Sequence, residues 1–265
     1  MPKVQLAGAT VLLTGATGGI GRAIARELTA HGARLVLTGR RAGALHSLAT
    51  EFDAQVITAD LAQPGAAARL RDAAGPVDVL IANAGVPAAG RLREFTPERI
   101  EMAVGVNLRA PMTLAHAFGA AMCERGDGHL VFMGSIASQL PAPCASVYNA
   151  TKFGLRGFAL GLRHEMGEHG VGVSIVEPGF IRSAGMFADS GTSLPLGIRT
   201  LAPEHVAAAV VRAIRDDVDE IVVAPLELRL GAMMGCLAPG LLSPIQRLIG
   251  ADKVSSDFGA SFARG

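Results

Sequence analysis

Short apolar runs rich in leucine and β-branched residues alternate along the chain with longer segments in which apolar residues recur at helical spacing. Near-continuous apolar runs are typical of strands buried on both faces of a parallel sheet, and the longer segments are typical of the covering helices. The alternation indicates βαβ units and predicts an α/β fold with a doubly wound parallel sheet of about seven strands. The expected strands are residues 9–14, 34–39, 55–58, 77–83, 129–134, 172–177 and 220–224.

The length of the chain fits a single sheet of this kind, because 265 residues are within the size of one α/β domain. We expect residues 1–224 to form that domain and residues 225–265 to form an apolar C-terminal extension. The charge-free run 230–246 is shorter than the ~20 residues of a membrane-spanning helix and contains Pro239 and Pro244. We expect the extension to pack on the domain or a partner subunit; a lid over a bound ligand and contact with a membrane surface are the alternatives.

Composition and charge exclude several classes of partner. The chain is 50% apolar and carries 24 basic and 23 acidic residues, so neither disorder nor electrostatic binding of nucleic acid is expected. Cys123, Cys144 and Cys236 show no CxxC pairing and no histidine at ligand spacing, which predicts reduced thiols and no metal site. The start of the chain has the pattern of a strand rather than of a cleaved signal, and we expect a cytoplasmic protein.

A glycine cluster, Thr14-Gly15-Ala16-Thr17-Gly18-Gly19-Ile20-Gly21, follows the first expected strand and precedes a helix expected to reach His31. Glycines at such a turn let a pyrophosphate approach the free amides of the helix N-terminus, where the helix dipole favours negative charge. This position predicts a Rossmann-type dinucleotide site, with a purely structural glycine turn as the alternative.

The end of the second expected strand bears on the choice of dinucleotide. An acidic residue at this place would bind the ribose 2′-hydroxyl of NAD(H). The chain instead has Arg40 and Arg41, whose guanidinium groups suit a 2′-phosphate. NADP(H) is therefore favoured over NAD(H), and the alternative is that both arginines belong to a solvated helix start.

Tyr148 and Lys152 are candidates for proton transfer. They are four residues apart in a segment of helical spacing, so the ammonium can lie beside the phenol and lower its pKa from about 10. Ser135, a possible hydroxyl donor, and Asn107, a possible ligand for a water, are candidates for the same sheet edge. Singly, Tyr148 is as well explained by packing, Ser135 by a helix cap and Asn107 by a polar helix surface. The chain has no tryptophan and no other tyrosine.

Together these segments resemble the short-chain dehydrogenase/reductase family from about residue 3 to residue 224. The glycine cluster matches the family's TGxxxGxG motif, residues 83–85 match its NAG motif, and Asn107, Ser135, Tyr148 and Lys152 match its catalytic tetrad. Ala82 and Ser183 depart from the residues most usual in the family. The cofactor contacts that the resemblance implies are Gly15, Thr17, Gly19, Ile20, Gly21, Arg40, Asp60, Leu61, Asn83, Ala84, Gly85, Tyr148, Lys152, Pro178, Gly179, Ile181 and Ser183.

The resemblance also implies roles for the tetrad. Tyr148 would exchange a proton with the substrate oxygen, and Lys152 would bind the nicotinamide ribose and depress the pKa of Tyr148. Ser135 would orient the carbonyl, and Asn107 would anchor a relay water. The implied activity is an NADP(H)-dependent interconversion of a ketone or aldehyde and an alcohol.

Apolar residues in the segment 180–200 and in the extension favour a lipophilic substrate, such as an acyl, steroid-like or retinoid-like compound. The resemblance also implies a homodimer or homotetramer, the usual oligomeric states of the family, and peripheral membrane contact is not favoured. A non-catalytic, dinucleotide-binding regulator with the same fold is the alternative function.

Overall fold

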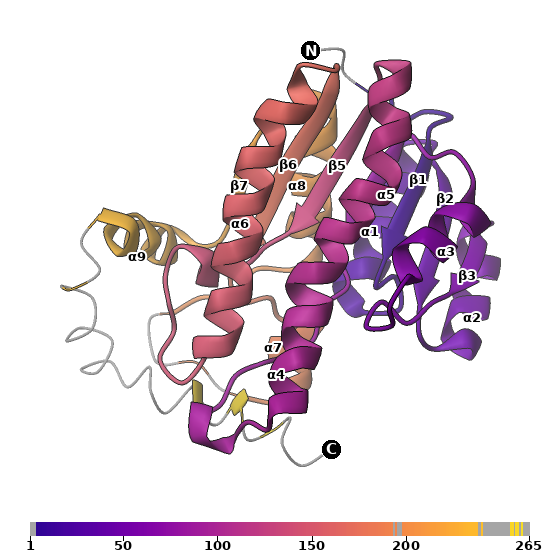
Figure 1. Cartoon of the computed structure of the whole chain (residues 1–265). Helices are drawn as coiled ribbons and strands as arrows, with labels where there is room; N and C mark the ends of the chain where they lie inside the picture. Colours follow the sequence, from indigo (N-terminus) through magenta and orange to yellow (C-terminus); the bar gives the residue numbers. More distant parts are fainter. Residues whose placement is uncertain are drawn as a thin grey trace.

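Seven parallel strands form one sheet in the computed structural model, which describes residues 4–192, 194, 198–237, 240, 255–256, 258–259 and 261. The strand order is β3-β2-β1-β4-β5-β6-β7 (Figure 1). The strands are β1 (Thr10–Thr14), β2 (Arg34–Gly39), β3 (Gln55–Thr58), β4 (Val79–Ala82), β5 (Gly128–Met133), β6 (Val171–Pro178) and β7 (Glu220–Val223). The predicted doubly wound sheet is confirmed, and each expected strand begins and ends within two residues of the observed one.

Helices cover both faces of this sheet. One face packs against α1 (Gly19–Ala30), α2 (Ala42–Phe52) and α8 (Pro203–Asp216). The other packs against α3 (Ala66–Ala74), α5 (Ala110–Arg125) and α6 (Ser146–Gly167), of which α5 and α6 stand in front of the sheet in Figure 1. Within β1, the side chains of Val11 and Leu13 belong to the apolar core on the first face of the sheet, and that of Leu12 belongs to the core on the other face. This burial on both faces explains the continuous apolar runs in the sequence.

The sheet changes winding direction between β1 and β4. From β1 the chain continues outward to β2 and β3, whereas from β4 it continues to β5, β6 and β7 on the other side. The connections on the two sides diverge, so a crevice opens at the carboxyl ends of β1 and β4, the usual ligand position in such folds.

The helical segment that contains Asn107 has an interruption. It consists of α4 (Pro97–Val104), a π-helical turn (Gly105–Arg109) and α5. Asn107 is in this wider turn and fully buried. Such π turns often occur at functional sites.

The C-terminal extension begins with α9 (Leu226–Leu237). Leu228 and Ala232 on α9 pack against Ile136, Phe180 and neighbouring apolar residues. Pro239 and Pro244, and the side chain of Cys236, lie outside the described residues.

Candidate active site

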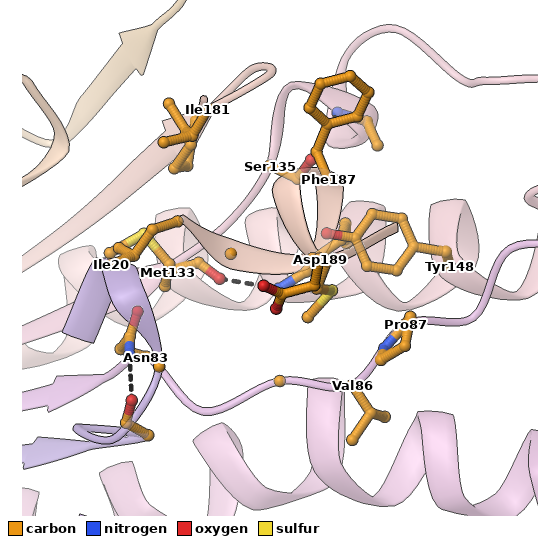
Figure 2. A pocket seen from close by; sticks show the side chains of 18 of the residues that line it. Ile20, Asn83, Val86, Pro87, Met133, Ser135, Tyr148, Ile181, Phe187 and Asp189 are labelled. Carbon is orange, nitrogen blue, oxygen red and sulfur yellow. Dashed lines mark hydrogen bonds between the residues drawn. The ribbon is translucent and has the colours of Figure 1, made fainter. Parts of the chain in front are cut away.

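A cavity of about 970 Å³ lies at the carboxyl edge of the sheet. Its wall includes Gly15 after β1, Asn83 after β4, Gly134 after β5 and Gly179 after β6. Tyr148 lines the cavity together with Ser135, and Ile20 and Asn83 come from the glycine-loop side (Figure 2). The predicted dinucleotide loop and the predicted proton-transfer residues therefore share one cavity.

The glycine loop is tied to the end of β4. The Thr14 hydroxyl oxygen accepts hydrogen bonds from the backbone amides of Asn83 (3.0 Å) and Ala84 (2.9 Å). In return, the Asn83 side-chain amide donates to the carbonyl oxygens of Thr14 (3.0 Å) and Gly15 (3.3 Å). Gly15 has φ of +65°, and a Cβ there would lie 2.8 Å from the Ala84 Cα. The glycine and NAG motifs thus form one rigid backbone unit.

The N-terminus of α1 opens into this cavity. Gly18 precedes the helix and gives it no side-chain cap, so first-turn amides remain available to a ligand. Gly19, Ile20 and Gly21 line the cavity. A Cβ on Gly21 would overlap the Gly15 carbonyl oxygen, which explains why a glycine is needed inside a helix.

Arg40 and Arg41 both line the cavity beyond the end of β2. The Arg41 guanidinium donates to the Thr17 carbonyl oxygen (2.9 Å) and so belongs to the glycine loop. Arg40 is exposed. The buried Thr38 hydroxyl has no hydrogen-bond partner in the described part of the chain, and Asp60 and Leu61 complete this side of the wall.

Tyr148 and Lys152 lie on one face of α6, as predicted. The buried Lys152 Nζ donates to the Met133 carbonyl oxygen (2.9 Å) and lies 5.7 Å from the centre of the Tyr148 ring. Burial raises the pKa of Tyr148, and a hydrogen bond with Ser135 opposes this shift. Burial lowers the pKa of Lys152 to about 8, and the charge of Glu177 opposes it.

Ser135 follows β5; it caps the next turn and also lines the cavity. Its hydroxyl oxygen accepts from the Ala137 amide (3.2 Å), which caps the 3₁₀ turn Ile136–Ser138. It also lines the cavity with Tyr148. The cap interpretation is therefore correct without excluding a role at the site.

Two predicted residues do not line the cavity. Both polar atoms of the Asn107 side chain contact Val86: the oxygen accepts from its amide (2.8 Å) and the nitrogen donates to its carbonyl (2.9 Å). Asn107 thus fixes the loop after the NAG motif, and its relay-water role stays a prediction. Ser183 is exposed, with φ of +62°, and its cofactor contact also stays a prediction.

The end of the cavity beyond Tyr148 is mostly apolar. Phe180 and Phe187 meet edge to face with ring centres 5.0 Å apart. Leu194, Ile198 and Leu228 add further apolar wall. An ion pair between Arg199 and Glu227 (2.9 Å) joins the segment after Ile198 to α9. Helix α9 therefore forms part of the cavity wall as well as packing on the domain.

Comparison with known proteins agrees with these features. Residues 9–193 match the family model described as short chain dehydrogenase. The chain belongs to the short-chain dehydrogenase/reductase family. It is 33% identical over 261 residues to dehydrogenase/reductase SDR family member 7B of Bos taurus, covering 90% of this chain and 80% of that protein. It is 35% identical over 255 residues to the ketoacyl reductase HetN of a Nostoc strain, covering 90% of this chain and 86% of that protein.

A solved structure shows the same fold. The short-chain dehydrogenase from Sphingobium yanoikuyae in complex with NADPH has a TM-score of 0.76 and 28% identity, over 89% of this chain and 95% of that one. This short-chain dehydrogenase/reductase is thus an oxidoreductase of carbonyl and alcohol groups. None of the helices in the described residues is long and apolar enough to cross a membrane.

The sequence did not indicate a group of buried polar residues behind Ser135 in this dehydrogenase. Glu177 at the end of β6 is fully buried, and its carboxyl contacts Ser138 and Gln139. Glu220 of β7 contacts the same Gln139 and also Arg156 of α6. The available signal was an acidic residue within each of two apolar strands, at 177 and 220.

Proposed function

We propose that this short-chain dehydrogenase/reductase interconverts a ketone or aldehyde and an alcohol on a lipophilic substrate, with NADP(H) as cofactor and Tyr148 as the acid/base. The observation that carries the proposal is the shared cavity, in which Tyr148, Lys152 and Ser135 lie between a dinucleotide-type glycine loop and an apolar chamber.

The cavity fits a nicotinamide dinucleotide. The uncapped N-terminus of α1 suits a pyrophosphate, and the buried hydroxyl of Thr38, which has no partner among the residues that the structure describes, suits a polar ligand group. The residues that would hold the dinucleotide are the glycine loop, Asp60 and Leu61, Asn83 to Gly85, Lys152, and Pro178 to Ile181. When bound, such a cofactor supplies or accepts the hydride of the reaction.

The residues of the chain manage the proton. Tyr148 donates its phenolic proton to the substrate oxygen in the reductive direction and takes it back in the oxidative direction. Since burial raises the pKa of Tyr148, an adjacent positive charge is needed to favour the phenolate at neutral pH. Lys152 supplies that charge while held by the Met133 carbonyl oxygen. Ser135 donates a hydrogen bond that orients the carbonyl.

The preference for NADP(H) rests on Arg40. Its exposed guanidinium lines the cavity beyond β2, where it can reach a 2′-phosphate, whereas Arg41 is held by Thr17. Several solved relatives were crystallised with NADP or NADPH, which supports the same preference.

The lipophilic substrate rests on the walls beyond Tyr148. Phe180, Phe187 and Leu228 offer apolar contact there, and the similarity to a ketoacyl reductase favours an acyl chain within this class. A homodimer or homotetramer is expected, because apolar side chains such as Met112 and Phe153 are exposed on α5 and α6. Location in the cytoplasm stays a prediction.

The decisive experiment follows NADPH oxidation with a panel of carbonyl compounds, comparing the wild type with Tyr148→Phe. We expect the substitution to lower kcat about a thousandfold, within the range for loss of a general acid, while NADPH binding changes little. Phe158→Tyr, which adds a phenol on α6 away from the cavity, is the matched control in the wild-type background. Equal turnover by the wild type and Tyr148→Phe would contradict the proposal, and tight NADPH binding without turnover of any carbonyl would favour the regulator instead.

A further inference from the structure

The buried group behind Ser135 joins three elements at the back of the active site. Glu177 extends from β6, Ser138 and Gln139 come from the turn that follows Ser135, and Glu220 extends from the adjacent β7. Glu177 and Ser138 are completely shielded from solvent. No step of the proposed reaction uses this carboxyl, so its burial needs another explanation.

The Ser138 hydroxyl has a single hydrogen to donate, and this bears on the protonation state of Glu177. The Ser138 hydroxyl oxygen lies 2.6 Å from the Ser135 carbonyl oxygen and also contacts a carboxyl oxygen of Glu177. A serine hydroxyl has one hydrogen to donate, and both neighbours would be acceptors if Glu177 were ionised. A neutral Glu177 resolves the conflict, because its O–H donates to Ser138 and leaves the serine hydrogen for the Ser135 carbonyl.

The second carboxyl oxygen of Glu177 has a donor of its own. The Gln139 side-chain amide donates to it and also, at 2.9 Å, to Glu220. Glu220 is paired with a cation, because the Arg156 guanidinium donates to its two carboxyl oxygens at 2.5 and 3.1 Å. The Arg156 Nε is 4.0 Å from Glu177. Charge compensation therefore favours an ionised Glu220 beside a neutral Glu177.

The electrostatics agree with this assignment. Burial raises the pKa of Glu177 to about 8; hydrogen bonding with Ser138 and Gln139 opposes this shift, and the neighbouring carboxyl of Glu220 adds to it. Burial opposes ionisation of Glu220 as well, but hydrogen bonding from Arg156 lowers its pKa overall. Lys152 on α6 also interacts electrostatically with Glu177, and an ionised Glu177 would raise the pKa of Lys152.

We propose that Glu177 is protonated in the working enzyme and acts as a positioning residue, holding the Ser135 turn through Ser138 and Gln139. When Glu177 ionises, the donor to Ser138 is lost, so the orientation of Ser135 weakens. This role rests on the proposed function of Ser135 and Tyr148.

The protonation state can be tested without any substrate. In infrared spectra of the purified enzyme at pH 7, we expect a protonated-carboxyl band that shifts in D₂O, is absent from Glu177→Gln and remains in Glu51→Gln. Glu51 is a matched control because it is a surface carboxylate paired with Arg22 and does not line the cavity. The band should disappear above pH 8, because the pKa of Glu177 is raised to about 8. A wild type without the band, or a band that persists in Glu177→Gln, would overturn the proposal.

Thermal unfolding gives a second reading of the same state. An unfolded chain ionises this carboxyl near pH 4.5, whereas the folded protein holds the proton until about pH 8. The stability that comes from the protonated carboxyl is therefore complete below pH 4.5 and is lost as the pH rises through 8. The melting temperature of Glu177→Gln should rise relative to that of the wild type across this interval, and a pH-independent difference would contradict a neutral Glu177.

Kinetics separate positioning from simple support of the fold. A glutamine amide can donate to Ser138 and accept from Gln139, so Glu177→Gln should keep kcat within about twofold at pH 7 and lose the alkaline decline due to Glu177. Glu177→Ala and Ser138→Ala should lower kcat about tenfold with little change in the KM for NADPH. Equal loss in the glutamine and alanine variants would refute positioning. If no carbonyl compound is reduced while the infrared band is present, the proposed function fails and the protonation state stands.

Discussion

At the glycine-loop end of the cavity, hydrogen bonds between Thr14, Asn83 and neighbouring backbone atoms fix the chain. Beyond Tyr148, apolar side chains such as Phe180 and Leu228 enclose the space instead. Backbone hydrogen bonding requires particular residues at particular positions, whereas apolar walls tolerate many residues of similar size. The first end is therefore expected to be common to many dehydrogenases of this family, and we expect the second end to set the substrate specificity of this enzyme.

One added methyl group should distinguish the two ends most clearly. Gly21→Ala places a Cβ against the Gly15 carbonyl oxygen, while Gly231→Ala on α9 places one 3.5 Å from the Leu140 side chain, an ordinary contact. We expect Gly21→Ala to weaken NADPH binding about a hundredfold, since the glycine loop must move, and Gly231→Ala to change it by less than about twofold. Fluorescence titration of NADPH measures both constants, and similar values for the two variants would remove the distinction.

A smaller effect is expected from the charge beyond β2. Arg40→Ala should raise the Kd of NADPH about tenfold and leave that of NADH nearly unchanged, because only NADPH carries the 2′-phosphate. Arg26→Ala removes another exposed arginine, on the outer side of α1 and paired with Glu51, and serves as the control. If Arg40→Ala affects both dinucleotides alike, Arg40 is a surface charge only.

The smallest change should come from the wall that α9 contributes. Gly231→Leu fills part of the apolar chamber, so kcat/KM for a long-chain or polycyclic carbonyl should fall about fivefold relative to a small one. Gly43→Leu adds the same side chain on the exposed surface of α2, where nothing lies within 4 Å of the added Cβ. An unchanged ratio in Gly231→Leu would mean that the substrate does not reach α9.

The sequence predicted the glycine-loop end of the cavity residue by residue, and for the other end it predicted only an apolar character. Strand 34–39 was placed without error, because its buried centre, Leu35 to Leu37, is a continuous apolar run. The loop from Gly15 to Gly21 was found because its motif is local and its chemistry needs glycine. The π turn around Asn107 was missed, since one extra residue in a turn hardly alters the apolar spacing of a helix.

The residues that the sequence missed act through long-range pairing. Glu177 and Glu220 are far apart along the chain, and only the pairing of β6 with β7 brings them to the same amide. Leu228 lines the cavity because α9 packs against Ile136. Ile136 precedes β6 along the chain and Leu228 follows β7, so this contact is also long-range. Neither relation leaves a local pattern.

Tyr148 has a consequence for spectroscopy. The chain contains no tryptophan and one tyrosine, and that tyrosine is half-buried in the cavity between the glycine loop and the apolar chamber. Phenol emission excited in the ultraviolet therefore arises at the active site alone, and a bound nicotinamide that absorbs in the same region should quench it. The unlabelled enzyme carries its own optical sensor of cofactor occupancy, which a second tyrosine on the surface would obscure.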